Sequence, residues 1–138
     1  MTSITPASTP ATVETGRLLR LALRLDAVVT GGNGLVYLLF AGPINGLLGL
    51  PVPLQRGIGA FLAVYGVAVW LLARPAAVNR AAVLAIITVN VLWTVLSVAE
   101  LALGGLQVTV AGAVWVVMQA VVVGGFAALQ CLGLRGGR

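Results

Sequence analysis

Hydrophobic residues fill four long runs of the chain, and only short connecting segments separate these runs. They lie at about 18–41, 57–73, 81–103 and 108–134. At 1.5 Å per helical residue, about 20 apolar residues cross the roughly 30 Å hydrocarbon core of a bilayer, and the second run is near the lower limit. Short connections make consecutive helices antiparallel neighbours. The pattern therefore predicts an all-α fold, a transmembrane four-helix up-down-up-down bundle.

The segments outside the runs differ in composition. Residues 1–16 are rich in Thr, Ser, Ala and Pro, which predicts a disordered cytoplasmic tail before a transmembrane domain at 17–138. The connection at 42–55 contains three prolines and an Asn-Gly pair, which interrupt helices. Its leucines keep it apolar, so we expect this loop to lie in the membrane interface or to fold over the bundle. A re-entrant pore loop is the alternative.

The overall composition excludes an ordinary soluble domain. Hydrophobic residues make up 60% of the chain, charged residues make up 8%, and the mean hydropathy is +1.11. Soluble domains carry about 25% charged residues, and a domain of this size has too little interior to hide so much apolar surface. The chain is therefore expected to use lipid as its solvent.

The charges indicate how the chain is threaded through the membrane. All eight basic residues are arginine, and the net charge is +5. If the amino terminus is cytoplasmic, Arg56 lies outside and seven arginines lie inside: Arg17, Arg20, Arg24, Arg74, Arg80, Arg135 and Arg138. The positive-inside rule then predicts that both termini are cytoplasmic. These arginines flank apolar runs, so we expect contact with the lipid bilayer and not with nucleic acid.

Polar and aromatic residues form stripes along three of the four runs. In the first run they recur at i, i+4, i+7 and i+11, which places them on one helix face. Buried polar groups in lipid need partners, so we expect the stripes to face one another. The candidate interior polar path consists of Asp26, Thr30, Asn33, Tyr37, Asn90, Thr94, Ser97 and Gln119. The same stripes also contain Trp93, Trp115, Phe126 and Gln130.

Small residues mark the expected packing surfaces, because they let helices approach closely in lipid. Such lines include Ala27 and Gly31 in the first run and Gly59, Ala63 and Gly66 in the second. The clearest line is Ala120, Gly124 and Ala128 in the fourth run. We expect this last line to pack within the bundle, with a homodimer interface as the alternative.

The two acids within the runs lie at opposite ends of the predicted bundle. Asp26 is placed near the cytoplasmic end, in the layer of Arg80 and Arg135, and Glu100 is placed near the outer end, level with Arg56. This arrangement predicts structural ion pairs at both levels. The alternative role for each acid is a proton-binding or cation-binding carboxylate.

The residues that are missing exclude several kinds of chemistry. The chain has no histidine and no lysine, so it offers no histidine ligand for haem or zinc and no Schiff-base lysine. Its single cysteine, Cys131, cannot form an intrachain disulfide. We expect no catalytic residues, no metal site and no cofactor.

Three segments resemble small uncharacterised four-helix integral membrane proteins common in actinobacteria. They are residues 23–35 (LRLDAVVTGGNGL), 81–93 (AAVLAIITVNVLW) and 126–130 (FAALQ). The resemblance covers most of the chain from Arg17 onward and implies a bacterial plasma (inner) membrane location, but no activity. Small multidrug-resistance transporters also have a first-helix carboxylate, but their motif does not match the sequence around Asp26. Dual-topology fluoride channels need balanced arginines, and DoxX-like proteins share only the four-helix plan.

Three functions remain open at this point. We expect a non-enzymatic structural or accessory subunit, either as a homo-oligomer or with a membrane protein partner. The first alternative is a small transporter or channel that uses Asp26, Asn33, Asn90 and Gln119. The second alternative is a binder of an apolar ligand such as a lipid or quinone, with a pocket lined by Tyr37, Trp93, Trp115 and Phe126.

Overall fold

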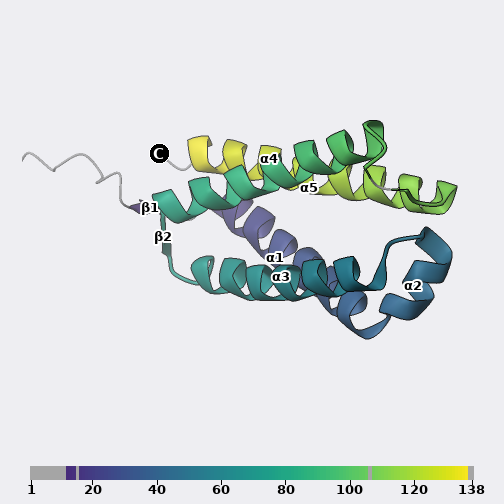
Figure 1. Cartoon of the computed structure of the whole chain (residues 1–138). Helices are drawn as coiled ribbons and strands as arrows, with labels where there is room; N and C mark the ends of the chain where they lie inside the picture. The colour runs from purple at the N-terminus through teal and green to yellow at the C-terminus, as the bar shows by residue number, and fades with distance from the viewer. Residues whose placement is uncertain (1–11, 15, 106, 137–138) are drawn as a thin grey trace, which may run out of the picture.

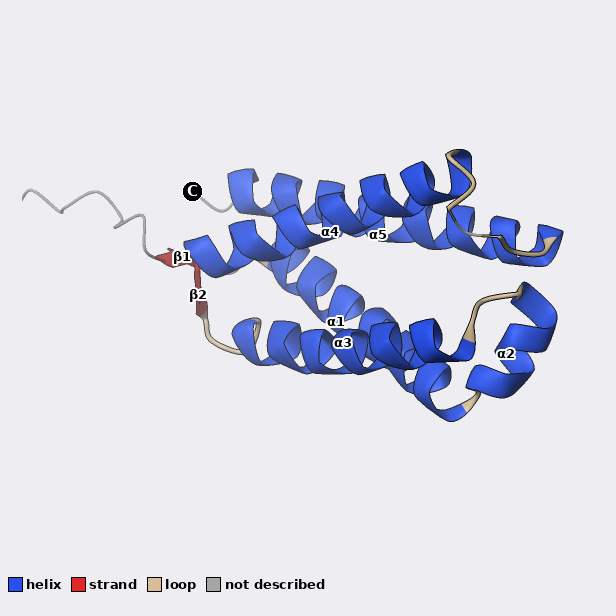
Figure 2. Ribbon diagram, viewed as in Figure 1, coloured by secondary structure: helices blue, strands red, loops and turns tan. Residues whose placement is uncertain are grey.

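The computed structural model is almost entirely helical and describes residues 12–14, 16–105 and 107–136. Most of the expected tail, and Arg138, lie outside the described residues. In chain order the elements are β1 (Thr12–Glu14), α1 (Arg17–Leu39), α2 (Ala41–Leu48), α3 (Val52–Leu72), β2 (Ala77–Asn79), α4 (Arg80–Ala102) and α5 (Val110–Gly136). The four long helices lie side by side, and α2 closes one end (Figures 1 and 2).

The first hydrophobic run is broken where the sequence predicted a continuous helix to residue 41. Helix α1 ends at Leu39, and α2 follows at an angle of 95°. The expected loop at 42–55 is therefore wrong over most of its length. Pro43 falls in the first turn of α2, where a backbone N–H has no helical acceptor and a proline is tolerated.

Helix α3 starts about one turn earlier than predicted, for a related reason. Pro51 is its N-cap residue, and Pro53 lies in its first turn, so these prolines begin a helix instead of ending one. The chain reaches this point through Gly49, whose φ of +78° ends α2 in the left-handed conformation that glycine adopts readily. The second long helix is thus comfortably long enough to span a membrane.

A short antiparallel ribbon lies at the opposite end of the bundle from α2. Val13 of β1 pairs with Val78 of β2, so residues 12–14 of the segment expected as a disordered tail form a strand. Val78 is also buried in the apolar core, and the Asn79 side chain caps α4 by accepting from the Ala82 backbone N–H at 3.0 Å. Strand β2 of the ribbon therefore lies in the connection between α3 and α4.

The helices pack as two pairs. Helix α1 packs most closely on α3, and α4 packs on α5, while α1 also contacts α5. A Cβ atom added to Gly66 would lie 2.7 Å from the Gly31 backbone, so these two glycines bring α1 and α3 into backbone contact. In the other pair, Gly124 lies against Thr94, in agreement with packing inside the bundle. Helices α3 and α4 are not among the closely packed pairs.

The outer surface of the bundle is apolar along its length. Three helices are long and apolar enough to cross a membrane, and a fourth span is present if the bent pair of α1 and α2 counts as one. Many large hydrophobic side chains on these helices are exposed, including Val64, Leu92 and Val121. The chain is therefore built as a multi-pass membrane protein.

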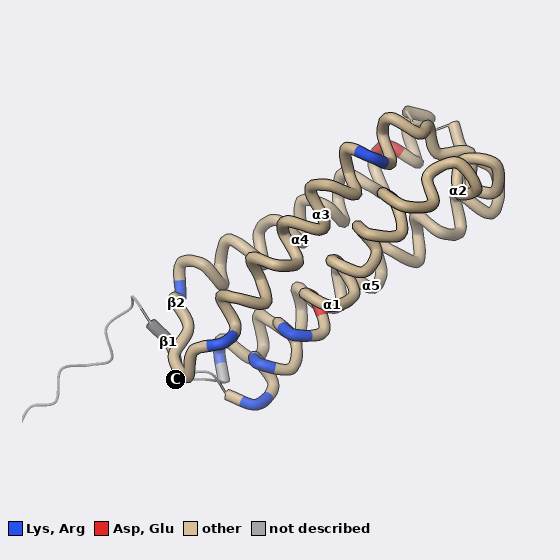
Figure 3. Tube along the Cα trace, turned by 90° about the horizontal axis from the view of Figure 1, so that it is seen from below, with Lys and Arg blue, Asp and Glu red and all other residues tan. Residues whose placement is uncertain are grey.

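Basic residues gather at the end of the bundle that carries β1 and β2, called here the arginine end (Figure 3). Helix α1 begins there at Arg17 and α4 begins there at Arg80. Arg135, in the last turn of α5, lies at the same end, whereas Arg56 lies in the first turns of α3 near α2. The opposite end is called the α2 end below.

Candidate functional site

The Asp26 carboxylate is fully buried in the bundle. Its Oδ1 accepts from the Thr30 hydroxyl at 2.8 Å, and its Oδ2 accepts from Asn90 Nδ2 and Gln130 Nε2, both at 2.7 Å. These donors come from α1, α4 and α5, so one side chain joins three helices. A buried carboxylate is costly in a membrane unless polar groups satisfy it, and three donors do so here.

A tyrosine links the fourth long helix to this group. The Tyr65 hydroxyl of α3 lies 3.2 Å from both Asn90 Oδ1 and the Ile86 carbonyl oxygen. Asn90 Nδ2 also donates to Gln130 Oε1 at 3.1 Å, which closes the network. We call Asp26, Thr30, Tyr65, Asn90 and Gln130 the Asp26 cluster. Every long helix of the bundle contributes to it.

The predicted ion pairs of Asp26 are not formed. Within the described part of the chain, neither Arg80 nor Arg135 makes a salt bridge to it, and its acceptors are occupied by neutral donors. Asp26 lies nine residues after the start of α1, and Asn90 lies ten residues after Arg80. At 1.5 Å per residue, both lie about 14–15 Å from the arginine end. The carboxylate is thus deeper in the bundle than the sequence predicted.

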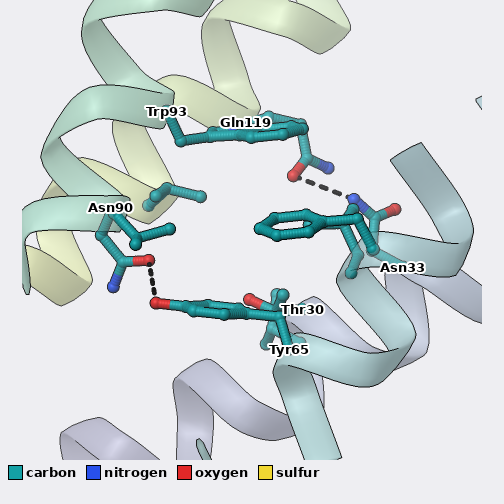
Figure 4. Close-up of a pocket in the computed structure, with 11 residues that line it drawn as sticks. Thr30, Asn33, Tyr65, Asn90, Trp93 and Gln119 are labelled. Carbon is teal, nitrogen blue, oxygen red and sulfur yellow. Dashed lines mark hydrogen bonds between the residues drawn. The ribbon is translucent and has the colours of Figure 1, made fainter. Parts of the chain in front are cut away.

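A second polar contact joins the two helix pairs nearer the α2 end. Asn33 Nδ2 of α1 donates to Gln119 Oε1 of α5 at 3.2 Å. Figure 4 shows this contact and the Tyr65–Asn90 contact on facing sides of a small pocket. The pocket has a volume of about 20 Å³ and is lined mostly by apolar surface, with Thr30, Asn33, Tyr65, Asn90 and Gln119 among its residues. A volume of roughly 10–15 Å³ holds one water, so this pocket is about water-sized.

A larger and partly open cavity continues from this pocket toward the α2 end. Its volume is about 300 Å³, and it shares Asn33, Trp93 and Gln119 with the small pocket. We call it the cleft. It is lined by Asn33, Tyr37, Leu50, Leu54, Ile58, Trp93, Leu96, Ser97, Glu100, Trp115, Val116 and Gln119. Because α3 and α4 are not closely packed and contribute exposed lining residues, the cleft opens sideways between them.

The predicted ion pair between Glu100 and Arg56 is also not formed among the described residues. Both side chains are exposed, and no salt bridge joins them. Glu100 on α4 lines the cleft, and Leu54 and Ile58 of α3 line its other wall. The separation of α3 and α4 at this end explains why the two charges do not meet.

The other predicted site residues divide into those on the cleft and those outside it. The Trp115 indole N–H donates to the Tyr37 hydroxyl at 2.8 Å, and both rings line the cleft together with Trp93 and Ser97. Thr94 instead donates to the Asn90 and Ala120 carbonyl oxygens, at 2.9 and 3.4 Å. Phe126 is buried and does not line the cleft, so its predicted place in a ligand pocket is wrong.

Sequence reasoning missed two polar residues, Tyr65 and Gln55. Tyr65 lies in the run that showed no polar stripe. Gln55 was placed at the end of a loop, yet it is fully buried, and its Nε2 donates to the Ala41 and Leu50 carbonyl oxygens at 3.0 and 2.7 Å. These bonds hold α2 against the start of α3, and Leu50 then forms part of the cleft wall. The available sequence signal for a folded connection was a single glutamine in an otherwise apolar segment with three prolines.

The described residues contain no group of three or more His, Cys, Asp or Glu side chains that could hold a metal ion. The only cysteine, Cys131, is exposed on α5. What the arrangement offers is an apolar and aromatic cavity with a small number of amide and hydroxyl groups at its inner end. Such a cavity can bind and orient a molecule through hydrogen bonds.

No family model matches the chain, and no curated protein or solved structure matches it. A function for this chain therefore has to be inferred from its site.

Proposed function

We propose that this protein is a non-enzymatic, multi-pass protein of a bacterial inner membrane that binds an amphipathic molecule in the cleft between α3 and α4. The ligand has an apolar body and an uncharged polar head, as a quinone or a neutral lipid does. The observation that carries the proposal is the cleft itself, a cavity of about 300 Å³ that opens sideways between two helices. Ligand pockets typically start near this volume.

The lining of the cleft supports this class of ligand. Leucine, isoleucine and valine side chains form much of its wall, and Tyr37, Trp93 and Trp115 add aromatic surface. Two amides, Asn33 and Gln119, meet at the inner end, and Ser97 and Glu100 of α4 add polar groups to the wall. An apolar pocket with a few convergent polar groups is the usual form of a small-molecule site. The polar head of the ligand would form hydrogen bonds with the Asn33 and Gln119 amides, and its apolar body would extend toward lipid.

The proposed threading is a four-helix up-down-up-down bundle with both termini in the cytoplasm, and the bent pair of α1 and α2 forms the first span. The arginine end carries most of the arginines, which supports its placement on the cytoplasmic side. A reporter fused after Arg138 should be active only in the cytoplasm. Activity of a periplasmic reporter at this position would contradict the threading.

Binding can be tested by native mass spectrometry with decyl-ubiquinone as the probe. The wild-type protein in mild detergent should retain one molecule of the probe. Ser97→Phe should abolish retention because it fills the cleft, whereas Val98→Phe, on the exposed neighbouring position, should not change it. Equal retention by the wild-type protein and the Ser97→Phe variant would contradict the proposal.

A second candidate function is transport, and the small polar pocket favours it. That pocket continues the cleft inward to Thr30 and Asn90, which both bind Asp26. A transported proton or cation would use this path. Asp26→Asn should then abolish flux in proteoliposomes, and unchanged flux would exclude transport. The accessory-subunit hypothesis predicts instead that a membrane protein partner co-purifies in mild detergent.

A further inference from the structure

A groove runs along the outer surface of α1 and α3 and shares no residue with the cleft. Its volume is about 300 Å³. Its surface is formed largely by small side chains, including Gly31, Gly32, Ala63 and Gly66, and Trp70 lies at one end. Because this surface faces outward from the bundle, its natural contact in a membrane is an acyl chain or another helix.

Three arginines of α1 lie between this groove and the arginine end of the bundle. Arg17, Arg20 and Arg24 recur at i, i+3 and i+7 of α1, and the same helix face continues to Val28 and Gly31 in the groove. The guanidinium carbon of Arg24 lies 5.6 Å from the centre of the Trp70 ring. The indole face supports the cation, and the guanidinium N–H groups at its edge remain able to bind phosphate oxygens.

No acid whose side chain the structure describes neutralises these arginines. Arg20 and Arg24 make no salt bridge to such an acid, and Asp26, the acid of α1, is fully buried and occupied by three neutral donors. The mouth of the groove is therefore positively charged, while the groove itself is apolar. This combination matches a molecule with an anionic head and a hydrocarbon chain.

We propose that the groove between α1 and α3 is a binding site for one anionic phospholipid. Its phosphate is held by Arg24 with help from Arg20, and one acyl chain lies over Gly31 and Gly32 against Trp70. A second copy of the chain fits less well. A twofold dimer with its axis along the membrane normal would bring Arg24 of each copy to the same level, where the like charges repel.

The test measures lipid binding to the full-length protein in neutral detergent by native mass spectrometry. Phosphatidylglycerol and phosphatidylcholine with the same chains are compared, and glycerol phosphate is added as a soluble competitor. We expect phosphatidylglycerol to be retained preferentially as one molecule. Arg24→Gln should weaken its affinity about fivefold, the effect of one charge near a membrane surface.

A second variant tests the groove separately from the charge. A Cβ atom on Gly32 would meet nothing within 4 Å, so Gly32→Leu fills the groove without disturbing the helix packing. It should weaken phosphatidylglycerol binding on the order of tenfold, equivalent to losing contact with about two methylenes. The matched controls are Arg135→Gln and Gly125→Leu on α5, where the glycine is equally unobstructed. Both controls should bind as the wild type does.

Three results would overturn the proposal. Equal retention of the two lipids would show that charge does not select the occupant. Full competition by glycerol phosphate would show that the lipid phosphate binds without any contribution from acyl-chain contact with the groove. A dimer that Gly32→Leu dissociates, without selective lipid retention, would show that the groove binds a second copy. None of these results depends on binding in the cleft.

Discussion

The two halves of the bundle use the same four long helices in different ways. Toward the arginine end, residues such as Leu19, Leu23, Val69 and Leu134 form a continuous buried core, and the Asp26 cluster joins every long helix. Toward the α2 end, the core is smaller, and the cleft separates α3 from α4. Among the described residues, isolated side-chain hydrogen bonds, such as Asn33 to Gln119 and Trp115 to Tyr37, join the two helix pairs there.

This difference places the larger packed core and the cavity at opposite ends of a small membrane protein. In lipid, helices gain little from hydrophobic association with each other, so close packing and hydrogen bonds determine which helices stay together. The arginine end has both, through the Gly31–Gly66 contact and the Asp26 cluster. The α2 end has fewer constraints between α3 and α4. We expect ligand entry and opening motions to be confined to that half.

The largest expected effect comes from breaking the Asp26 cluster. Asn90→Leu removes the donor to Asp26 and Gln130 and the partner of Tyr65. Leaving these buried groups unsatisfied should lower the free energy of unfolding by about 3 kcal/mol. The measurement is unfolding by SDS in mixed micelles, followed by circular dichroism.

The matched variant in the open half is Asn33→Leu, which removes a single neutral hydrogen bond. It should cost about 0.6 kcal/mol, the average for hydrogen bonds between membrane helices. Equal losses for Asn90→Leu and Asn33→Leu would contradict the distinction between a strongly joined half and a weakly joined half.

A smaller effect is expected from the glycine contact between α1 and α3. Gly66→Ala places a Cβ atom 2.7 Å from the Gly31 backbone, so the two helices must move apart. The cost should be about 2 kcal/mol, typical of overpacking. Gly32→Ala is the control, because its Cβ atom meets nothing, and it should stabilise the helix by up to about 1 kcal/mol. Similar unfolding curves for the two variants would argue against the close approach.

An effect as small as that of Asn33→Leu is expected for the Tyr37–Trp115 contact inside the cleft. Tyr37→Phe removes the acceptor of the Trp115 indole N–H but keeps the aromatic ring. Stability should fall by about 0.6 kcal/mol. Decyl-ubiquinone binding should change by less than about twofold, because Asn33 and Gln119 provide the polar end of the site. A complete loss of binding in a titration would show that the Tyr37 hydroxyl, and not the amide pair, holds the head.

The sequence predicted the long helices because the length and hydrophobicity of each apolar run are local properties of that run. Run length determines whether a segment crosses a bilayer, and it does not depend on the other helices. The connection at 42–55 was predicted incorrectly because proline was read as a helix breaker. Pro43 and Pro53 lie in first turns, a position that only the folded chain defines. The 95° bend after Leu39 likewise depends on contacts of α2 with other helices.

The sequence predicted which helix face carries the polar residues of the site. It did not predict their hydrogen-bond partners on the other helices. The i, i+4, i+7 spacing placed Asp26, Thr30 and Asn33 on one face. The ion pairs were wrong because the sequence of one helix does not show which side chains of the other helices face it. Asp26 therefore meets the neutral donors Asn90 and Gln130. The cleft follows from the spacing between α3 and α4, which no single segment encodes.

The most direct test of the cleft uses the positions of the three tryptophans. Trp93 and Trp115 line it, whereas Trp70 lies in the outer groove. Variants that keep one tryptophan and replace the other two by phenylalanine are titrated with decyl-ubiquinone, which quenches indole fluorescence. If the cleft binds the probe, Trp93 and Trp115 are quenched saturably at one equivalent, and Trp70 is quenched only in proportion to probe in the micelle. Unsaturable quenching of equal strength at all three positions would contradict binding in the cleft.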